Sequence, residues 1–155
     1  MWYFSYHSPI GKLTIYEEDG FISKIEFGNR EISQNTHESE LISKCYSELV
    51  EYFKGERKEF DLPLAPKGTE FQKKVWNALL KIPYGETRSY KDIAISIGNE
   101  KGCRAVGGAN NKNPIPIIIP CHRVIGINSK LVGYAGGLEI KSYLLNLEAK
   151  HLGKL

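Results

Sequence analysis

A cysteine and a histidine stand side by side at the end of an unusually apolar stretch of this 155-residue chain. Residues 115–120 read Ile-Pro-Ile-Ile-Ile-Pro, and Cys121, His122 and Arg123 follow them. The isoleucines favour burial, while Pro120 has no backbone N–H and biases the residue before it toward an extended backbone. We therefore expect a buried, strand-like segment that turns at Pro120 and gives the thiol a rigid support. A free cysteine is more often an inert small hydrophobe, so the dipeptide alone leaves both interpretations open.

A nucleophilic thiol needs a base or a positive neighbour, because an ordinary cysteine has a pKa of about 8.5 and is mostly protonated at neutral pH. His122 can supply either. Adjacent residues on an extended chain point to opposite sides, so we expect a water to link Cys121 and His122. A carboxylate on the other ring nitrogen would fix the imidazole tautomer. Glu148 is the candidate, although Cys, His and Glu together are not specific by themselves.

Glu148 falls near the end of a helix that the apolar spacing predicts from about residue 138. A carboxylate is unfavourable near a helix C-terminus. We therefore expect Glu148 to have a partner, which could be His122, Lys141 or solvent.

The N-terminal part of the chain is typical of a small sheet covered by a helix. Tight turns at residues 8–11 and 19–20 separate runs of alternating apolar residues, which predicts an antiparallel meander over residues 1–28. Apolar residues recur at helical spacing from about residue 38 to Gly55, and Cys45 lies on this stripe as a core residue. Residues 60–62 are predicted to form a further short strand.

The stretch 62–68 contains two prolines and a glycine and predicts a domain boundary. We expect an N-terminal α/β domain over residues 1–65 and a second domain over residues 66–155. Thr69 and Gln72 match a capping box at the start of a helix. Ser89 should cap a second helix, and a third short helix is expected over residues 104–110.

Two short helices joined by a glycine-containing turn are the outline of a helix-turn-helix. The second of these helices carries Gly107, Gly108 and Ala109, whose small side chains would let its backbone approach a partner closely. Close packing against another helix explains the same residues equally well.

The charge distribution favours an anionic partner. The formal net charge is +3, but residues 1–67 carry a net −4 and residues 68–155 a net +7. A segregated basic half indicates nucleic acid first, although an ordinary solvated surface is the alternative.

Other classes of protein are disfavoured. No apolar run is long enough for a membrane span, and the N-terminus lacks a signal-peptide pattern. The three widely spaced cysteines show no disulfide framework, so we expect a cytoplasmic protein that binds no membrane. The sequence has no metal-ligand spacing, no GxGxxG and no P-loop, which predicts neither a metal nor another cofactor.

Six ordered motifs between residues 68 and 148 make the chain similar to the O6-alkylguanine-DNA alkyltransferase family, and residues 1–60 match that family in outline only. The motifs are Gly68-Thr69-Glu70-Phe71-Gln72, Ile82-Pro83-Tyr84-Gly85-Glu86 with Ser89-Tyr90, Arg104-Ala105-Val106-Gly107-Gly108-Ala109, Asn113-Pro114, Ile119-Pro120-Cys121-His122-Arg123-Val124 and Gly133-Tyr134-Ala135-Gly136-Gly137-Leu138.

The resemblance implies repair of double-stranded DNA by a single-use alkyl transfer from O6-alkylguanine, and from O4-alkylthymine, to Cys121. His122 would act as the base through a water and Glu148 would orient it. Tyr90 would crowd the phosphate beside the flipped base and donate a proton to the base. Asn113 would be the hinge between the recognition helix and the active site.

The resemblance also assigns the surfaces that hold DNA and the base. Arg104 would fill the gap that the flipped base leaves in the stack. The recognition helix would enter the minor groove, with the DNA-binding set Arg104, Tyr90, Ala105, Gly107, Gly108, Ala109 and Asn110. The base pocket would be formed by Cys121, Val124, Tyr134, Ala135 and Gly136. Ala135 stands where some members carry serine, and the roles of Cys103 and Arg123 stay open.

The elements and the resemblance together predict an α+β fold, with a winged-helix-like helix-turn-helix in the C-terminal domain, and a monomer. A non-catalytic protein that senses alkyl lesions on the same scaffold is the alternative, although related proteins of that class lack the acceptor cysteine. A cysteine hydrolase using Cys121 and His122 is a third hypothesis; such an enzyme would turn over many times and ignore DNA.

Overall fold

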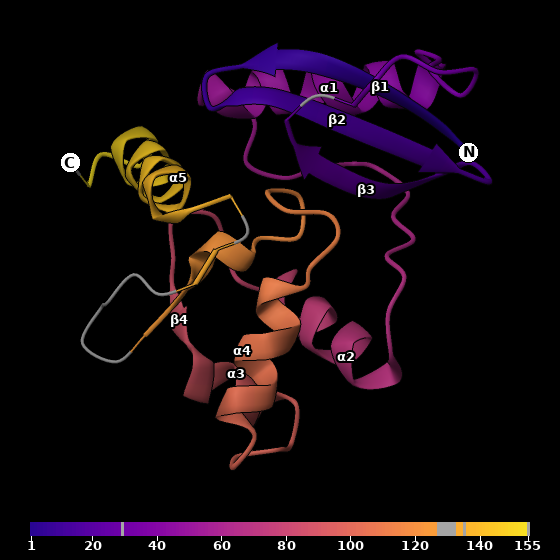
Figure 1. The fold of residues 1–155 in the computed structure, drawn as a ribbon. Helices are drawn as coiled ribbons and strands as arrows, with labels where there is room; N and C mark the ends of the chain where they lie inside the picture. The colour runs from indigo at the N-terminus through magenta and orange to yellow at the C-terminus, as the bar shows by residue number, and fades with distance from the viewer. Residues whose placement is uncertain (29, 127–132, 135, 155) are drawn as a thin grey trace. The chain divides into compact units, whose positions relative to one another are not determined.

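The computed structural model describes residues 1–28, 30–126, 133–134 and 136–154. The chain folds into two compact units, Met1–Lys67 and Gly68–Leu155 (Figure 1). The first combines an antiparallel sheet with a helix and the second is mostly helical, so the predicted α+β class is confirmed. Among the described residues, no helix has the length and apolar character needed to cross a membrane.

The first unit is a three-stranded meander covered by one helix. Strands β1 (Trp2–Ser8), β2 (Gly11–Glu18) and β3 (Phe21–Phe27) pair in sequence order, and every pairing is antiparallel. Helix α1 (Glu40–Phe53) begins where the Ser39 side chain accepts a hydrogen bond from the backbone N–H of Ile42. Cys45 is fully buried, as predicted, and burial raises the pKa of its thiol to about 12.

The short strand predicted at residues 60–62 does not form. Residues 60–62 are irregular, and the chain hydrogen-bonds to β3 only after residue 62. There the N–H of Ile22 donates to the carbonyl of Pro63, and the N–H of Ala65 donates to the carbonyl of Ile22. Pro63 and Pro66 have no N–H with which to continue a ladder, which explains why pairing stops there.

The second unit is built around three helices, and each begins within one residue of the position that the sequence predicts. Helix α2 (Glu70–Leu79) has the expected capping box between Thr69 and Gln72. A two-residue strand β4 (Arg88–Ser89) leads into helix α3 (Tyr90–Ser96), which has a second capping box. Helix α4 (Cys103–Asn111) packs against both α2 and α3, so α3 and α4 form the predicted helix-turn-helix.

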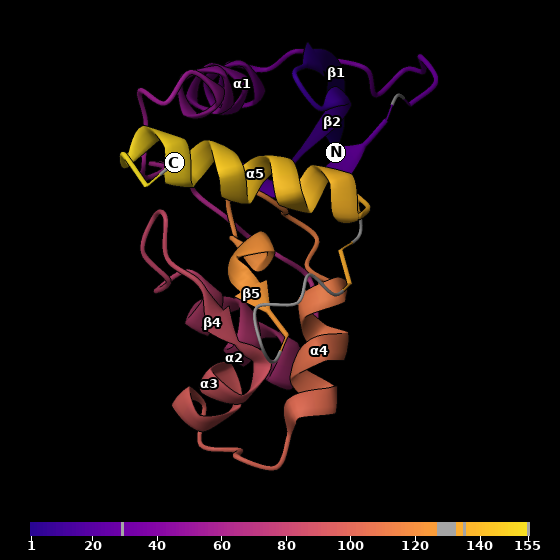
Figure 2. The same cartoon turned by 90° about the vertical axis from the view of Figure 1, so that its left-hand side faces the viewer.

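The remaining elements of this unit carry the candidate chemistry. Among the described residues they are the 3₁₀ turn η1 (Cys121–Arg123), the strand β5 (Val124–Ile125) and the helix α5 (Leu138–His151). β5 pairs in parallel with β4, and η1 packs against α5 (Figure 2). The return strand expected at Val132 lies outside the described residues.

The apolar stretch before Cys121 is buried as predicted, but it is a tight turn rather than a strand. The N–H of Ile119 donates to the carbonyl of Ile115 at 3.0 Å. The Asn113 side chain holds both ends, because its Nδ2 donates to the Ile119 carbonyl at 2.8 Å and its Oδ1 accepts from the Ile115 N–H at 3.0 Å. Ile117 takes a φ of 74°, a left-handed conformation that is strained for a β-branched residue.

Candidate active site

Glu148 is the centre of a buried hydrogen-bond network that joins three elements. Its Oε2 lies 2.6 Å from His122 Nε2. Arg123 grips the same carboxylate with two nitrogens, Nε to Oε1 at 2.9 Å and Nη2 to Oε2 at 3.0 Å. The backbone N–H of Gly85 donates to Oε1 at 3.0 Å. Of the partners considered from the sequence, His122 is the one that the structure places on Glu148, and Arg123 joins it.

The network fixes the charge of Glu148. Burial by itself raises the pKa of this carboxyl, but hydrogen bonds from His122 and Arg123 and the positive charge of Arg123 outweigh it and lower the pKa to about 2. Glu148 is therefore a carboxylate at neutral pH. It lies in the last turn of α5, where the helix dipole opposes a negative charge, so the Arg123 guanidinium offsets an unfavourable position.

The carboxylate also fixes the tautomer of His122. His122 is fully buried, and burial lowers its pKa, so the imidazole is neutral. A neutral imidazole has one N–H, and the short contact with a carboxylate places that hydrogen on Nε2. Nδ1 is then an unprotonated acceptor, and it has no hydrogen-bond partner among the described residues. Nδ1 is thus the basic atom of the site.

Cys121 is buried and protonated in this arrangement. Its side chain is 4% exposed, and burial raises the pKa of the thiol to about 11. A hydrogen bond with the Asn113 side chain and the positive charge of Lys141 act in the opposite direction and favour the thiolate. The backbone at Cys121 and His122 forms a 3₁₀ turn rather than the extended chain assumed from the sequence.

Lys141 is a buried cation beside the thiol that the sequence did not mark as part of the site. Its ammonium donates to the Val124 carbonyl at 2.6 Å and to the Gly133 carbonyl at 3.3 Å. Burial lowers the pKa of Lys141. The residue thus links α5 to β5 and to the segment that begins at Gly133. Lys141 and Glu148 lie two turns apart on the same face of α5. Their spacing in the sequence could therefore have indicated that Lys141 belongs to the site.

Two tyrosines predicted for the site lie within electrostatic range of the thiol. Burial raises the pKa of Tyr90, as does the nearby Cys121, while a hydrogen bond with Asn110 lowers it. Burial also raises the pKa of Tyr134, with further contributions from Cys121 and Glu148. The structure therefore brings both phenols toward Cys121. Gly136 lies in the loop before α5, and Ala135 lies outside the described residues.

A cavity of about 770 Å³ opens between the start of α3, α4 and the end of β5. It is lined by both Tyr90 and Arg104, together with Gly107 and the half-buried Ile125 at the end of β5. Thr87, Arg88, Ser89, Lys91, Asp92, Cys103 and Gly126 complete the lining, and none of these was singled out as a site residue from the sequence. Their position in the sequence could have indicated them, because each lies at or beside the start of α3, the start of α4 or the end of β5.

Helix α4 presents only part of its predicted DNA-binding set to solvent. Arg104, Ala105 and Gly108 are exposed. Ala109 and Asn110 are buried, at 4% and 2% exposure, and their contact with DNA stays a prediction. The helix turns them inward, where the Ala109 carbonyl accepts from Trp76 Nε1 at 2.9 Å and Asn110 Nδ2 donates to the Cys121 carbonyl at 3.4 Å.

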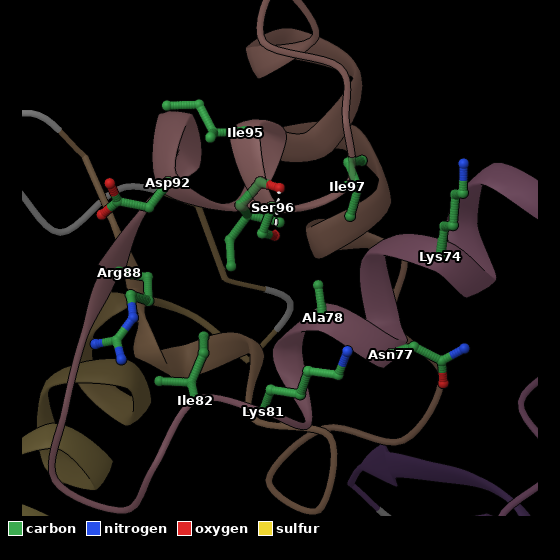
Figure 3. Close-up of a pocket in the computed structure, with 11 residues that line it drawn as sticks. Lys74, Asn77, Ala78, Lys81, Ile82, Arg88, Asp92, Ile95, Ser96 and Ile97 are labelled. Atoms are coloured by element: carbon green, nitrogen blue, oxygen red, sulfur yellow. Dashed lines mark hydrogen bonds between the residues drawn. The ribbon is translucent and has the colours of Figure 1, made fainter.

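A second cavity, of about 720 Å³, lies between α2 and α3 (Figure 3). Isoleucines from α3 and from the ends of both helices line it, with Lys74 and Lys81 at its edge. It shares Arg88 and Asp92 with the first cavity but contains none of the residues predicted for catalysis. No group of residues that could hold a metal ion occurs in the described part of the chain.

Comparisons with known proteins cover nearly the whole chain. Residues 70–150 match the family described as 6-O-methylguanine DNA methyltransferase, DNA binding domain, and residues 1–66 match the corresponding ribonuclease-like domain. The chain is 52% identical to the methylated-DNA–protein-cysteine methyltransferase of Methanosarcina acetivorans, over 96% of this chain and 98% of the relative. It is 50% identical to the constitutive methylated-DNA–protein-cysteine methyltransferase of Bacillus subtilis, over 95% and 94%.

A solved structure described as Mycobacterium tuberculosis OGT in complex with DNA superimposes with a TM-score of 0.90 at 45% identity, covering 97% of this chain and 94% of that one.

Proposed function

Because the chain belongs to the 6-O-methylguanine DNA methyltransferase family, we propose that it repairs DNA by moving the alkyl group of O6-alkylguanine to Cys121. The observation that carries the proposal is the buried set of Cys121, His122 and Glu148, in which a neutral imidazole keeps Nδ1 as a free acceptor. A nucleophile, a base and an orienting carboxylate are the parts that activation of a thiol needs. O4-alkylthymine is a second expected substrate.

The reaction balances as a displacement. His122 Nδ1 takes the thiol proton, through a bridging water, and the Cys121 thiolate attacks the alkyl carbon. An S–C bond forms while the bond between that carbon and O6 breaks. Tyr90 donates its proton to the departing guanine and recovers one from His122, so the net effect is that the thiol loses one proton and the guanine gains one. The product thioether has no electrophilic carbonyl for water to attack, so each chain acts once.

Access to the base requires that it leave the duplex. Extruding a base costs a few kcal/mol, least where the pair is already damaged. Arg104 is exposed on α4 and lines the 770 Å³ cavity together with Tyr90, which suits a plug and a phosphate contact at the place that the base enters. The exposed small residues of α4 would let its backbone lie close to the floor of the minor groove.

A direct test supplies duplex DNA that carries O6-methylguanine with an isotopically labelled methyl group. The label should move to the protein, at no more than one methyl group per chain, and should not be released as methanol. Cys121→Ser should bind the duplex without taking the label, while Cys45→Ala, which removes a thiol from the other unit, should still take it. Folded, DNA-binding protein that takes no label would support the non-catalytic sensor, and folded protein that neither binds the duplex nor takes the label would favour a hydrolase.

A further inference from the structure

Arg123 is a charged residue of the site to which the alkyl-transfer reaction gives no role. Its side chain is 7% exposed, and all three guanidinium nitrogens donate, two of them to Glu148 and Nη1 to the Ile82 carbonyl at 2.7 Å. The guanidinium also lies over the Tyr84 ring, with its carbon 5.6 Å from the ring centroid. Because the three hydrogen bonds and the ring contact all hold the planar guanidinium, its orientation is fixed.

Arg123 and His122 compete for the same carboxylate. Oε2 of Glu148 accepts from both, at 3.0 Å from Arg123 Nη2 and 2.6 Å from His122 Nε2. A buried His–Glu pair without a further cation can bind a proton and become imidazolium and carboxylate, because the two charges then attract at short range. A fixed guanidinium beside the pair opposes this, since it neutralises the carboxylate and repels an imidazolium.

We propose that Arg123 is a positioning residue that keeps His122 neutral, with its hydrogen on Nε2, by holding the Glu148 carboxylate between them. The inference rests on the proposed function only for its consequence, which is that Nδ1 stays available to accept the Cys121 proton when the pH falls. Without Arg123, His122 would be protonated at a higher pH and Nδ1 would be occupied.

The other titratable and charged groups around the His122–Glu148 pair oppose the protonation of His122, favour it, or are uncharged. Lys141 on α5 also opposes an imidazolium, as Arg123 does, and burial opposes it more than either. Glu148 favours an imidazolium. Tyr84, Tyr134 and Cys121, which face the network from the turn after α2, from the loop before α5 and from η1, are neutral acids with raised pKa values. Arg123 thus contacts the carboxylate directly, through two hydrogen bonds.

The test is an NMR pH titration of ¹⁵N-histidine-labelled protein without DNA, which reports the protonation of each ring nitrogen. The His122 signals are assigned by their loss in His122→Gln. In the unsubstituted protein, His122 should keep a single hydrogen on Nε2 at pH values where an ordinary histidine, with a pKa of about 6.5, is protonated. In Arg123→Met its titration should move up by about 1 pH unit or more. Arg123→Lys, which keeps the charge but loses the fork, should fall between them.

Arg123→Gln provides a second charge-removing variant if Arg123→Met does not fold, and Arg57→Met is the matched control. Arg57 forms an ion pair with Glu51 at 3.0 Å in the other unit, so its loss should leave the His122 titration in place. An imidazolium at pH 6 in the unsubstituted protein would overturn the inference, as would an unchanged His122 titration in both charge-removing variants. Because no methyl transfer is measured, failure here is distinguishable from failure of the proposed function.

Discussion

Glu148 and His122 are 26 residues apart in the chain, yet Oε2 of Glu148 lies 2.6 Å from Nε2 of His122 in a site closed to solvent. The contact exists because η1 packs against the last turns of α5. It makes the C-terminal helix part of the chemistry, since the carboxylate decides which imidazole nitrogen is basic. Changes in α5 should therefore affect both stability and thiol activation.

Glu148→Gln should destabilise the protein by about 3–5 kcal/mol, because it leaves the buried Arg123 charge without its counter-charge. Denaturant unfolding at pH 7 measures this. The exposed Glu139→Gln in the first turn of the same helix is the matched control, and its effect should stay within about 0.5 kcal/mol. A similar loss in both variants would argue against a special role for the Glu148 network.

Acid should weaken the folded state through the same carboxyl. The pKa of Glu148 is lowered from 4.5 to about 2 in the folded protein. The folded state therefore binds fewer protons here than the unfolded state, so its stabilisation is present above pH 4.5 and is lost as the pH falls toward 2. Unfolding free energies measured across this window should fall less steeply in Glu148→Gln than in the unsubstituted protein. Equal slopes would show that Glu148 does not titrate as the structure implies.

Lys141→Met should raise the pKa of Cys121 further, because the ammonium is a positive charge that favours the thiolate. The rate of Cys121 alkylation by iodoacetamide, followed as a function of pH in a Cys103→Ser background, should shift to higher pH. Lys141→Arg keeps the charge and should shift the profile less. If Lys141→Met leaves the profile in place, the buried lysine serves only to hold the carbonyls of Val124 and Gly133.

Two interpretations of the glycines of α4, close packing within the protein and close approach to DNA, can be distinguished by substitution. A Cβ at Gly108 would meet nothing within 4 Å, and one at Gly107 would make an ordinary contact with Tyr90. Gly108→Ala should therefore stabilise the helix by up to about 1 kcal/mol. If the small side chains serve close approach to DNA, the same variant should bind duplex DNA more weakly. A more stable variant with unchanged DNA affinity would favour the packing interpretation.

Gly68 provides the contrast to Gly108, because a methyl group at Gly68 has no room. An added Cβ would overlap the Trp76 ring, which cannot retreat because its Nε1 donates to the Ala109 carbonyl at 2.9 Å. Gly68→Ala should cost about 1–3 kcal/mol, as overpacking usually does, and thermal unfolding would reveal it. A neutral effect would mean that α2 can shift relative to Gly68.

The sequence predicted the elements of the fold well where local signals agreed. The capping box at Thr69, the cap at Ser89, the meander and the helix-turn-helix depend on neighbouring residues, so spacing alone was informative. The segment 115–119 was misjudged because its backbone is set by the Asn113 side chain and by a left-handed Ile117. A run of isoleucines does not reveal a conformation that a β-branched residue rarely adopts.

The candidate site was predictable in its members but not in its connections. Cys121, His122 and Glu148 were chosen by chemistry and by resemblance, while Arg123 was left without a role. Its fork reaches Glu148 and Ile82, contacts that no local pattern encodes. Asn110 was assigned to the DNA-binding set by resemblance, while in the structure its Nδ2 donates to the Cys121 carbonyl at 3.4 Å.

The most direct measurement of the central claim is the mass of the proteolytic peptide that contains Cys121, after incubation with excess duplex DNA bearing O6-methylguanine. The account predicts that this peptide gains the mass of one methyl group in place of one hydrogen, that the peptides of Cys45 and Cys103 gain nothing, and that the DNA recovers unmodified guanine. An unmodified Cys121 in folded, DNA-binding protein, or a methyl group on a different residue, would contradict it.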